Sequence, residues 1–114
     1  MDEKTVQSAM TIILNAGDAR VACKKALDAI AKSDFESAET YMKEAHQKIT
    51  EAHKVQTDAI QEETRGEKSE YSLLFAHAQD TLMTIYSEIN IAKQMIRIFK
   101  SYEERLEKLE KTLD

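Results

Sequence analysis

The scarcity of helix-breaking residues constrains this chain more than any other feature of its sequence. None of its 114 residues is proline and only two, Gly17 and Gly66, are glycine. Proline and glycine most often end helices and start turns, so few positions can interrupt regular structure. Hydrophobic residues make up 42% of the chain and charged residues 32%, a balance typical of amphipathic helices rather than of disorder or a membrane protein. The sequence therefore predicts a single all-α domain.

Apolar residues recur every three or four positions in three segments. These run from about residue 3 to 32, from about 34 to 64 and from about 69 to 113. Ser33 and Glu36 form a capping box, so we expect the second helix to start there. Gly66, within a polar stretch, is a candidate C-cap at which the chain reverses. The pattern predicts an antiparallel three-helix bundle with a long third helix.

The third segment carries more apolar residues than a single protomer would cover. Its apolar positions from Leu73 to Phe99 occupy more than one side of the helix, so self-association is expected. A heptad repeat of apolar residues then runs to the end of the segment: Ala92, Met95, Phe99, Tyr102, Leu106, Leu109 and Leu113. This heptad tail, residues 92–113, could either lengthen an oligomeric coiled coil or fold back on its own protomer, and spacing does not decide between them.

Charge and hydropathy exclude several classes of partner. The net charge is -5 and the pI about 5.3, without a concentrated basic stretch, so the sequence argues against nucleic acid as a partner. No apolar run is long enough to cross a bilayer, and the first ten residues lack the shape of a secretory signal. We expect a bacterial cytoplasmic protein.

One polar pair lies within the most apolar part of the third segment. His77 and Asp80 stand among Leu73, Leu74, Phe75, Ala76, Ala78, Leu82, Met83 and Ile85. At 100° per residue the two side chains lie about 60° apart on one side of the helix. That side offers no lysine or arginine to neutralise the carboxylate. Asp80 must therefore meet a cation, be protonated or be exposed, and the spacing leaves all three open.

Three motifs follow one another along the chain. Residues 12–20 read IILNAGDAR, residues 51–57 read EAHKVQT and residues 77–83 read HAQDTLM. Together, over about residues 5 to 100, they resemble the lactose/cellobiose/chitobiose-type enzyme IIA of the bacterial sugar phosphotransferase system. Three ordered motifs in so short a chain make this resemblance specific.

The resemblance implies a cytoplasmic homotrimer of three-helix protomers that carries phosphate. By its place in the motif, His77 would accept a phosphoryl group from the phosphocarrier HPr and pass it to a cysteine of the IIB component. The membrane would be reached only indirectly, through the IIC permease that binds the sugar, a β-linked disaccharide. Asp80 of three subunits would share one structural Mg²⁺ on the trimer axis. Thr81 stands where many members carry a second histidine, which weakens a relay role at that position.

A histidine suits phosphoryl transfer, and an aspartate suits binding of a metal ion. Phosphoryl exchange needs a neutral imidazole nitrogen, which the family assigns to Nε2, and its loose transition state depends on positioning the phosphoryl oxygens. Three converging carboxylates would repel one another, and a hard cation with oxygen ligands removes that penalty. Without the motifs, an ordinary core histidine and a solvated aspartate would be the better interpretation of His77 and Asp80.

Four further residues are candidate supports for the phosphoryl site. Gln79 could orient His77 or bind a phosphoryl oxygen. Asn15 and Arg20 flank Gly17 in a segment that the resemblance places near the site, although Gly17 could instead mark close helix packing and Arg20 could simply be solvated. His53 either approaches the site or satisfies a buried backbone group.

Two alternatives concern the role of Cys23 and the function of the whole chain. Cys23 could carry phosphate, but its neighbours at helical spacing are apolar, which favours a small core residue. A single cysteine also excludes an internal disulfide. The alternative function is that of a non-catalytic coiled-coil adaptor that binds partner helices.

Overall fold

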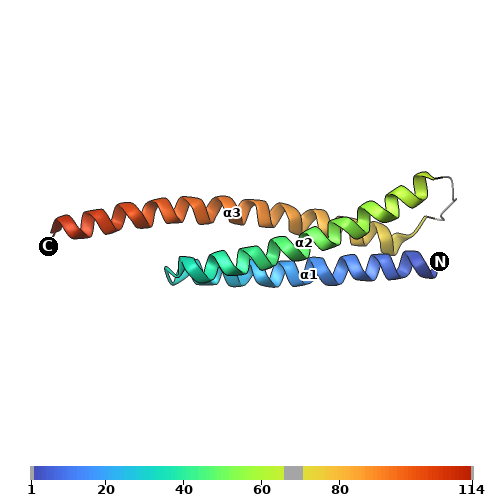
Figure 1. Ribbon diagram of the computed structural model, residues 1–114, viewed down its shortest axis with the longest axis horizontal. Coiled ribbons are helices and arrows are strands. Elements are labelled where there is room, and N and C mark those ends of the chain that lie inside the picture. The colour runs from blue at the N-terminus through green and yellow to red at the C-terminus, as the bar shows by residue number, and fades with distance from the viewer. Residues whose placement is uncertain (1, 66–70, 114) are drawn as a thin grey trace.

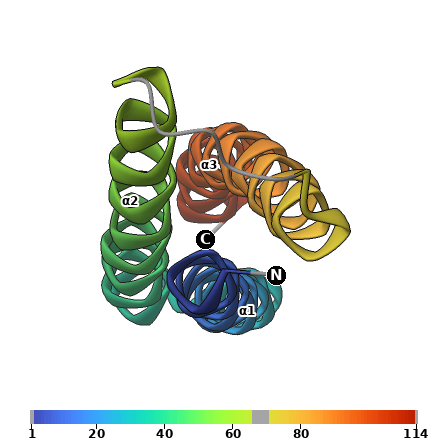
Figure 2. The same ribbon diagram turned by 90° about the vertical axis from the view of Figure 1, so that its right-hand side faces the viewer.

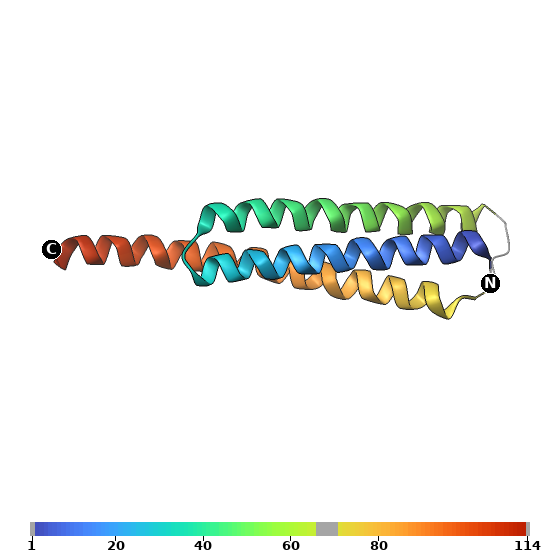
Figure 3. The same ribbon diagram turned by 90° about the horizontal axis from the view of Figure 1, so that it is seen from below.

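The computed structural model describes residues 2–65 and 71–113, which form three long helices (Figure 1). They are α1 (Glu3–Ala31), α2 (Phe35–Thr64) and α3 (Leu73–Leu113). α1 and α2 form an antiparallel hairpin, and α3 runs back in the direction of α1 (Figures 1 and 3). The predicted all-α, three-helix protomer is confirmed. Among the described residues, no helix is both long and apolar enough to cross a membrane.

Small side chains bring the helices together. α1 contributes mainly alanines to the core, and α1 packs along both other helices, whereas α2 and α3 meet over a shorter stretch (Figure 2). Alanine lets helix backbones approach closely and costs no side-chain entropy on burial. The largest fully buried side chains fill the spaces that remain: Ile12, Ile49, Leu82, Ile85 and Ile89. The core is thus a narrow seam on the inner faces of the three helices.

The α1–α2 turn differs from the predicted capping box. Ser33 adopts the left-handed conformation with φ 59°, and the backbone N–H groups of Ser33 and Asp34 donate to the carbonyls of Ile30 and Ala29. This pattern is a Schellman motif, in which Ser33 is the left-handed residue that ends α1. Asp34 is therefore the N-cap of α2, and its Oδ1 accepts from the Ser37 N–H at 3.1 Å. The predicted cap at Ser33 was wrong by one residue.

The start of α3 also lies later than the sequence suggested. α3 begins at Leu73, not near residue 69, because the Ser72 hydroxyl accepts a hydrogen bond from the Phe75 N–H at 3.1 Å and so satisfies a free donor at the helix start. The predicted C-cap at Gly66 and the residues around it, 66–70, lie outside the described residues.

The heptad tail does not fold back. α3 continues as one helix to Leu113 and projects beyond the α1–α2 hairpin (Figure 3). The Ser33 hydroxyl donates to Glu103 Oε2 at 3.5 Å, which marks where the hairpin ends alongside α3. The ten residues after Glu103 extend about 15 Å further at 1.5 Å per residue. The fold-back alternative is therefore excluded for this protomer.

Candidate functional site

His77 lies near the start of α3 with its side chain exposed. The next residue, Ala78, is fully buried and faces the core, so His77 points away from it. The backbone carbonyl of His77 accepts a hydrogen bond from the Thr81 hydroxyl at 2.8 Å, which holds that hydroxyl against the helix. Among the described residues, the imidazole ring makes no hydrogen bond or ion pair. The ring is thus exposed and without a hydrogen-bond partner in the described part of the protomer.

Asp80 is exposed on the same side of α3 as His77. Within the protomer its carboxylate meets no cation among residues 2–65 and 71–113. Other residues on this side are uncovered too: Leu73, Thr84, Ser87, Ile91 and Ile98. Ile91 is 59% exposed and Ile98 52%, unusually high for isoleucines at regular spacing. This side of α3, from Leu73 to Ile98, is thus an uncovered surface of small and apolar residues that also carries His77 and one carboxylate.

Arg20 belongs to a different part of the molecule. Its guanidinium donates to both carboxylate oxygens of Glu88, from Nε at 2.9 Å and from Nη2 at 2.8 Å. These hydrogen bonds to Glu88 raise the pKa of Arg20 above its ordinary value. Glu88 follows His77 by eleven residues, or about 16 Å along the helix. Within the protomer, Arg20 and His77 are therefore not brought together.

Asn15 and Gly17 lie on α1, and no hydrogen bond joins Asn15 to His77 in the described part of the chain. The Asn15 amide donates to the Thr11 carbonyl at 3.1 Å, within its own helix. A Cβ atom placed on Gly17 would have nothing within 4 Å. Close helix packing inside the protomer is therefore not the reason for this glycine.

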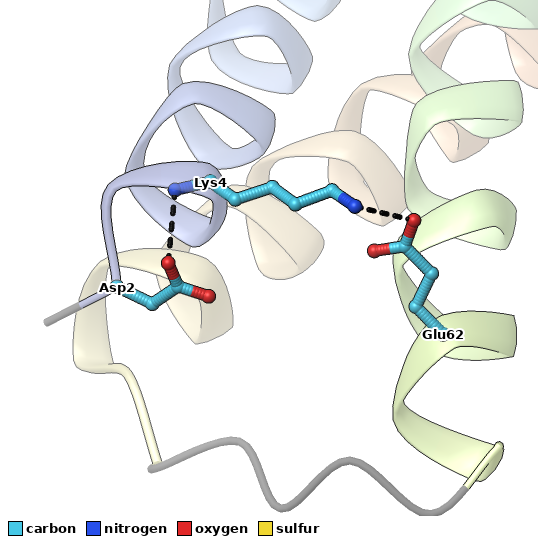
Figure 4. Close-up of polar contacts among 3 residues, drawn as sticks. All are labelled: Asp2, Lys4 and Glu62. Carbon is cyan, nitrogen blue, oxygen red and sulfur yellow. Dashed lines mark hydrogen bonds and ion pairs between the residues drawn. The ribbon is translucent and has the colours of Figure 1, made fainter.

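His53 belongs to α2 and packs against α3 on the side opposite His77. Gln79 belongs to α3 and also lies on that opposite side. The His53 ring packs edge to face on Tyr86, with ring centroids 5.1 Å apart, about nine residues further along α3 than His77. Gln79 lines a cavity of about 220 Å³ where the three helices meet near the chain's N-terminus. Beside this cavity, Lys4 links α1 to α2 through an ion pair of 2.6 Å with Glu62 (Figure 4). Neither residue shares a surface with His77 in the protomer.

The comparison with known proteins now decides the family. Residues 7–100 match the family described as the lactose/cellobiose-specific IIA subunit of the PTS system. The chain belongs to this IIA family. It is 40% identical over 93 residues to the lactose-specific EIIA component of Lacticaseibacillus casei, covering 82% of this chain and 83% of the relative.

Solved structures of IIA proteins share the fold. The crystal structure of the cellobiose-specific enzyme IIA from Bacillus anthracis superposes with a TM-score of 0.84 at 38% identity, covering 91% of this chain and 95% of that one. The chitobiose IIA of Escherichia coli, solved in complex with HPr, superposes with a TM-score of 0.73 at 28% identity, covering 90% of this chain and 99% of that one. The family match contains all three motifs and ends at residue 100, within the heptad tail.

The IIA chain also contains two polar residues that sequence reasoning missed. Glu88 holds Arg20, a pairing across two helices that periodicity within one helix cannot indicate. Gln56 carries a buried Oε1 atom without a hydrogen-bond partner among the described residues. The signal for Gln56 was present, because it lies four residues after Ala52 and three before Ala59 on the core-facing side of α2.

Cys23 is a core residue of this IIA chain, as predicted. It is 6% exposed and belongs to the main apolar cluster. Burial raises the pKa of the Cys23 thiol, and the negative charge of Glu88 adds to the effect. A thiol kept protonated in this way is a poor nucleophile, which argues against phosphate transfer through Cys23.

Proposed function

We propose that this IIA chain is the phosphocarrier of a sugar uptake system. It accepts a phosphoryl group from phospho-HPr on His77 and passes it to a cysteine of its IIB component, in the cytoplasm, for phosphorylation of an imported β-linked disaccharide. The observation that carries the proposal is His77 itself, an exposed imidazole without a ring partner among the described residues, inside the matched family region. The HPr complex of the chitobiose IIA supports HPr as the donor.

The geometry of His77 suits transfer between two proteins. Transfer breaks the bond between phosphorus and the donor side chain and forms a bond from phosphorus to Nε2 of His77, and the second transfer reverses this toward the IIB cysteine. Each step needs donor and acceptor to reach the same ring in line. An exposed ring on a rigid helix meets that need, whereas a core histidine would not.

Homotrimer formation is part of the proposal. The uncovered apolar side of α3 from Leu73 to Ile98 needs a covering surface, and three copies meeting along it would cover it. The same arrangement would bring three Asp80 carboxylates together. No group of three potential metal ligands occurs within the described part of one chain, whereas the trimer would supply one Asp80 carboxylate from each of three copies. Carboxylate oxygens fit Mg²⁺, which would neutralise the repulsion there as a structural ion.

The four candidate support residues have weaker grounds. Arg20 and His53 are engaged with Glu88 and Tyr86, and Gln79 and Asn15 lie away from His77 in the protomer. A role for any of them at the phosphoryl group would have to come from the neighbouring subunit of the trimer. We therefore assign the transfer step to His77 alone.

Phosphorylation in a reconstituted system tests the proposal. The chain is incubated with phosphoenolpyruvate, enzyme I and HPr, and its intact mass is measured. We expect an acid-labile gain of one phosphoryl group that is lost in His77→Gln and kept in the matched control His46→Gln. Phosphorylation of His77→Gln would contradict the assignment. Absence of any mass gain in the unaltered chain would favour the coiled-coil adaptor instead.

The metal assignment has its own test. Asp80→Leu replaces three expensive charges with apolar packing, so the variant should stay trimeric or associate more tightly, and should lose bound Mg²⁺ by elemental analysis. Sedimentation equilibrium measures the association. A monomeric Asp80→Leu variant would show that the ion is indispensable to the assembly.

The sugar itself is not assigned. The relatives described above are named for lactose, cellobiose and chitobiose, so members of one family serve different sugars. In the proposed system the IIC permease binds the sugar, and this chain does not contact it. Identification of the cognate IIC component, or the uptake defect of a deletion strain, would name the sugar.

A further inference from the structure

The neighbours of His77 on its own helix include one charge, and it is negative. Residues three and four positions apart lie side by side on a helix surface, and for His77 these are Leu73, Leu74, Asp80 and Thr81. The Thr81 hydroxyl donates to the His77 carbonyl at 2.8 Å, so it is already bound to the backbone. None of these four side chains therefore offers a positive charge to a phosphoryl group on the imidazole ring.

The rest of this side of α3 also lacks a cation. From Leu73 to Ile98 it carries no lysine or arginine. Arg20 of α1 is held by Glu88, about 16 Å along the helix from His77. A phosphorylated His77 thus shares its side of α3 with the Asp80 carboxylate and with no basic side chain.

This arrangement makes the phosphoryl group sensitive to what the carboxylate binds. A phosphoryl group adds a charge of about −1.5 to −2 near pH 7, so a bare Asp80 carboxylate beside it is repulsive. A divalent cation held by the Asp80 carboxylates attracts the same group. The presence or absence of the cation therefore changes the free energy of phosphorylated His77 more than that of unmodified His77.

We propose that Asp80 couples phosphorylation of His77 to binding of a divalent cation. The inference rests on the proposed function, which assigns the transfer step to His77 and a structural ion to Asp80, and it adds a regulatory link between the two. Coupling of this kind is reciprocal. Phosphorylation strengthens cation binding, and the bound cation shifts the phosphoryl group from HPr toward His77. Loss of the cation favours release of the phosphoryl group to the next protein.

The coupling is modest for one phosphoryl group and larger for the whole trimer. Charges of +2 and about −2 that lie roughly 10 Å apart in water at physiological salt change a binding constant about twofold. Three phosphoryl groups around one ion multiply this effect to about tenfold.

Cation binding to the two forms of the full chain measures the coupling. The chain is phosphorylated, separated from its protein partners and from metal ions at mildly alkaline pH, and titrated with Mn²⁺ as a probe for a Mg²⁺ site. The electron paramagnetic resonance signal of free Mn²⁺ reports how much ion is bound. We expect the phosphorylated chain to bind Mn²⁺ about tenfold more tightly than the unmodified chain. Equal affinities would overturn the proposal.

Phosphoryl exchange supplies the reciprocal measurement. Purified phospho-HPr and the chain are brought to equilibrium without enzyme I, in Mg²⁺ or in a chelator, at equal ionic strength. We expect Mg²⁺ to raise the exchange constant for each His77 about twofold. Linkage requires that the exchange factors of the three histidines multiply to the gain in ion affinity. Two results that disagree on this point would contradict a direct coupling.

Three variants separate Asp80 from general effects of the ion. Asp80→Asn keeps the size of the side chain and removes its charge, so the response to Mg²⁺ should disappear. Asp80→Leu gives the same comparison if the asparagine variant fails to assemble. Glu107→Gln removes a carboxylate about 45 Å further along α3 and should respond to Mg²⁺ as the unaltered chain does. An equal response in the Asp80 variants would show that the ion acts on the phosphoryl group alone, and the proposal would be wrong.

These measurements distinguish failure of the coupling from failure of the proposed function. A chain that phospho-HPr does not phosphorylate would refute the proposed function itself. A chain that is phosphorylated on His77, but exchanges equally with and without Mg²⁺, would refute only the coupling. A chain that binds no Mn²⁺ in either form would refute the coupling and the metal assignment, and would leave the transfer step intact.

Discussion

Replacement of Gly17 by alanine should stabilise this protein. Gly17 lies in the middle of α1, where glycine costs about 1 kcal/mol relative to alanine because the flexible backbone must be ordered. An added Cβ would have nothing within 4 Å, so no clash offsets this gain. For a chain of this size, about 1 kcal/mol corresponds to a rise in Tm of about 4 °C.

Thermal unfolding followed by circular dichroism measures the effect of Gly17→Ala. The protein concentration should keep both variants in the same assembly state, since association alters Tm. Gly17→Val is the matched control: its branched side chain recovers only part of the helix propensity, so Tm should rise in the order Gly, Val, Ala. A propensity effect predicts this order.

A fall in Tm on Gly17→Ala would refute this reasoning. Gly17 shares its side of α1 with Met10, Leu14 and Val21, all exposed apolar residues. A destabilised variant would mean that a second copy closes onto this side and leaves no room for a methyl group. Reduced phosphorylation by HPr at a raised Tm would instead support the interpretation of this segment as a wall of the donor site.

Three further changes follow from single observations in the fold. Gln56→Met should raise the free energy of unfolding by about 1 kcal/mol, seen as a higher urea midpoint, because it removes a buried amide oxygen that has no hydrogen-bond partner among the described residues; a lowered midpoint would reveal an interior partner. Ser33→Gly should raise Tm by relieving a left-handed conformation that costs about 1 kcal/mol in residues other than glycine, and an unchanged Tm would argue against the strain. Hydrogen bonds from Ser37 lower the pKa of Asp34, so its contribution to stability is present above its unfolded pKa and is lost as pH falls through the lower folded pKa. Asp34→Asn, which keeps the cap, should therefore reduce the loss of Tm below about pH 4, and an unaltered acid profile would contradict this.

The helices were predictable because their signals are local. Absence of proline, apolar periodicity and a polar break determine where helices can form, and the three-helix protomer follows from them. Helix ends were less predictable, because they depend on which side chain captures a free backbone group. Ser33 could cap α2 or end α1, and only the hydrogen bonds to Ala29 and Ile30 show that it ends α1.

The candidate site was predictable in part for a similar reason. His77 and Asp80 lie on one helix, so their shared side follows from spacing alone. Arg20 and His53 lie on other helices, and their distance from His77 depends on the register between helices. That register is set by pairings such as Arg20 with Glu88, which no single-helix pattern contains. The direction of the heptad tail was undecided for the same reason.

Mapping the phosphoryl group on the phosphorylated chain tests the central claim most directly. After incubation with phosphoenolpyruvate, enzyme I and HPr, the chain is digested at alkaline pH, where phosphohistidine survives, and its peptides are fragmented by electron transfer. We expect the phosphoryl group on His77, and its disappearance from that peptide when purified IIB is added. A phosphoryl group on His46 or His53, or one on His77 that IIB cannot remove, would contradict the account.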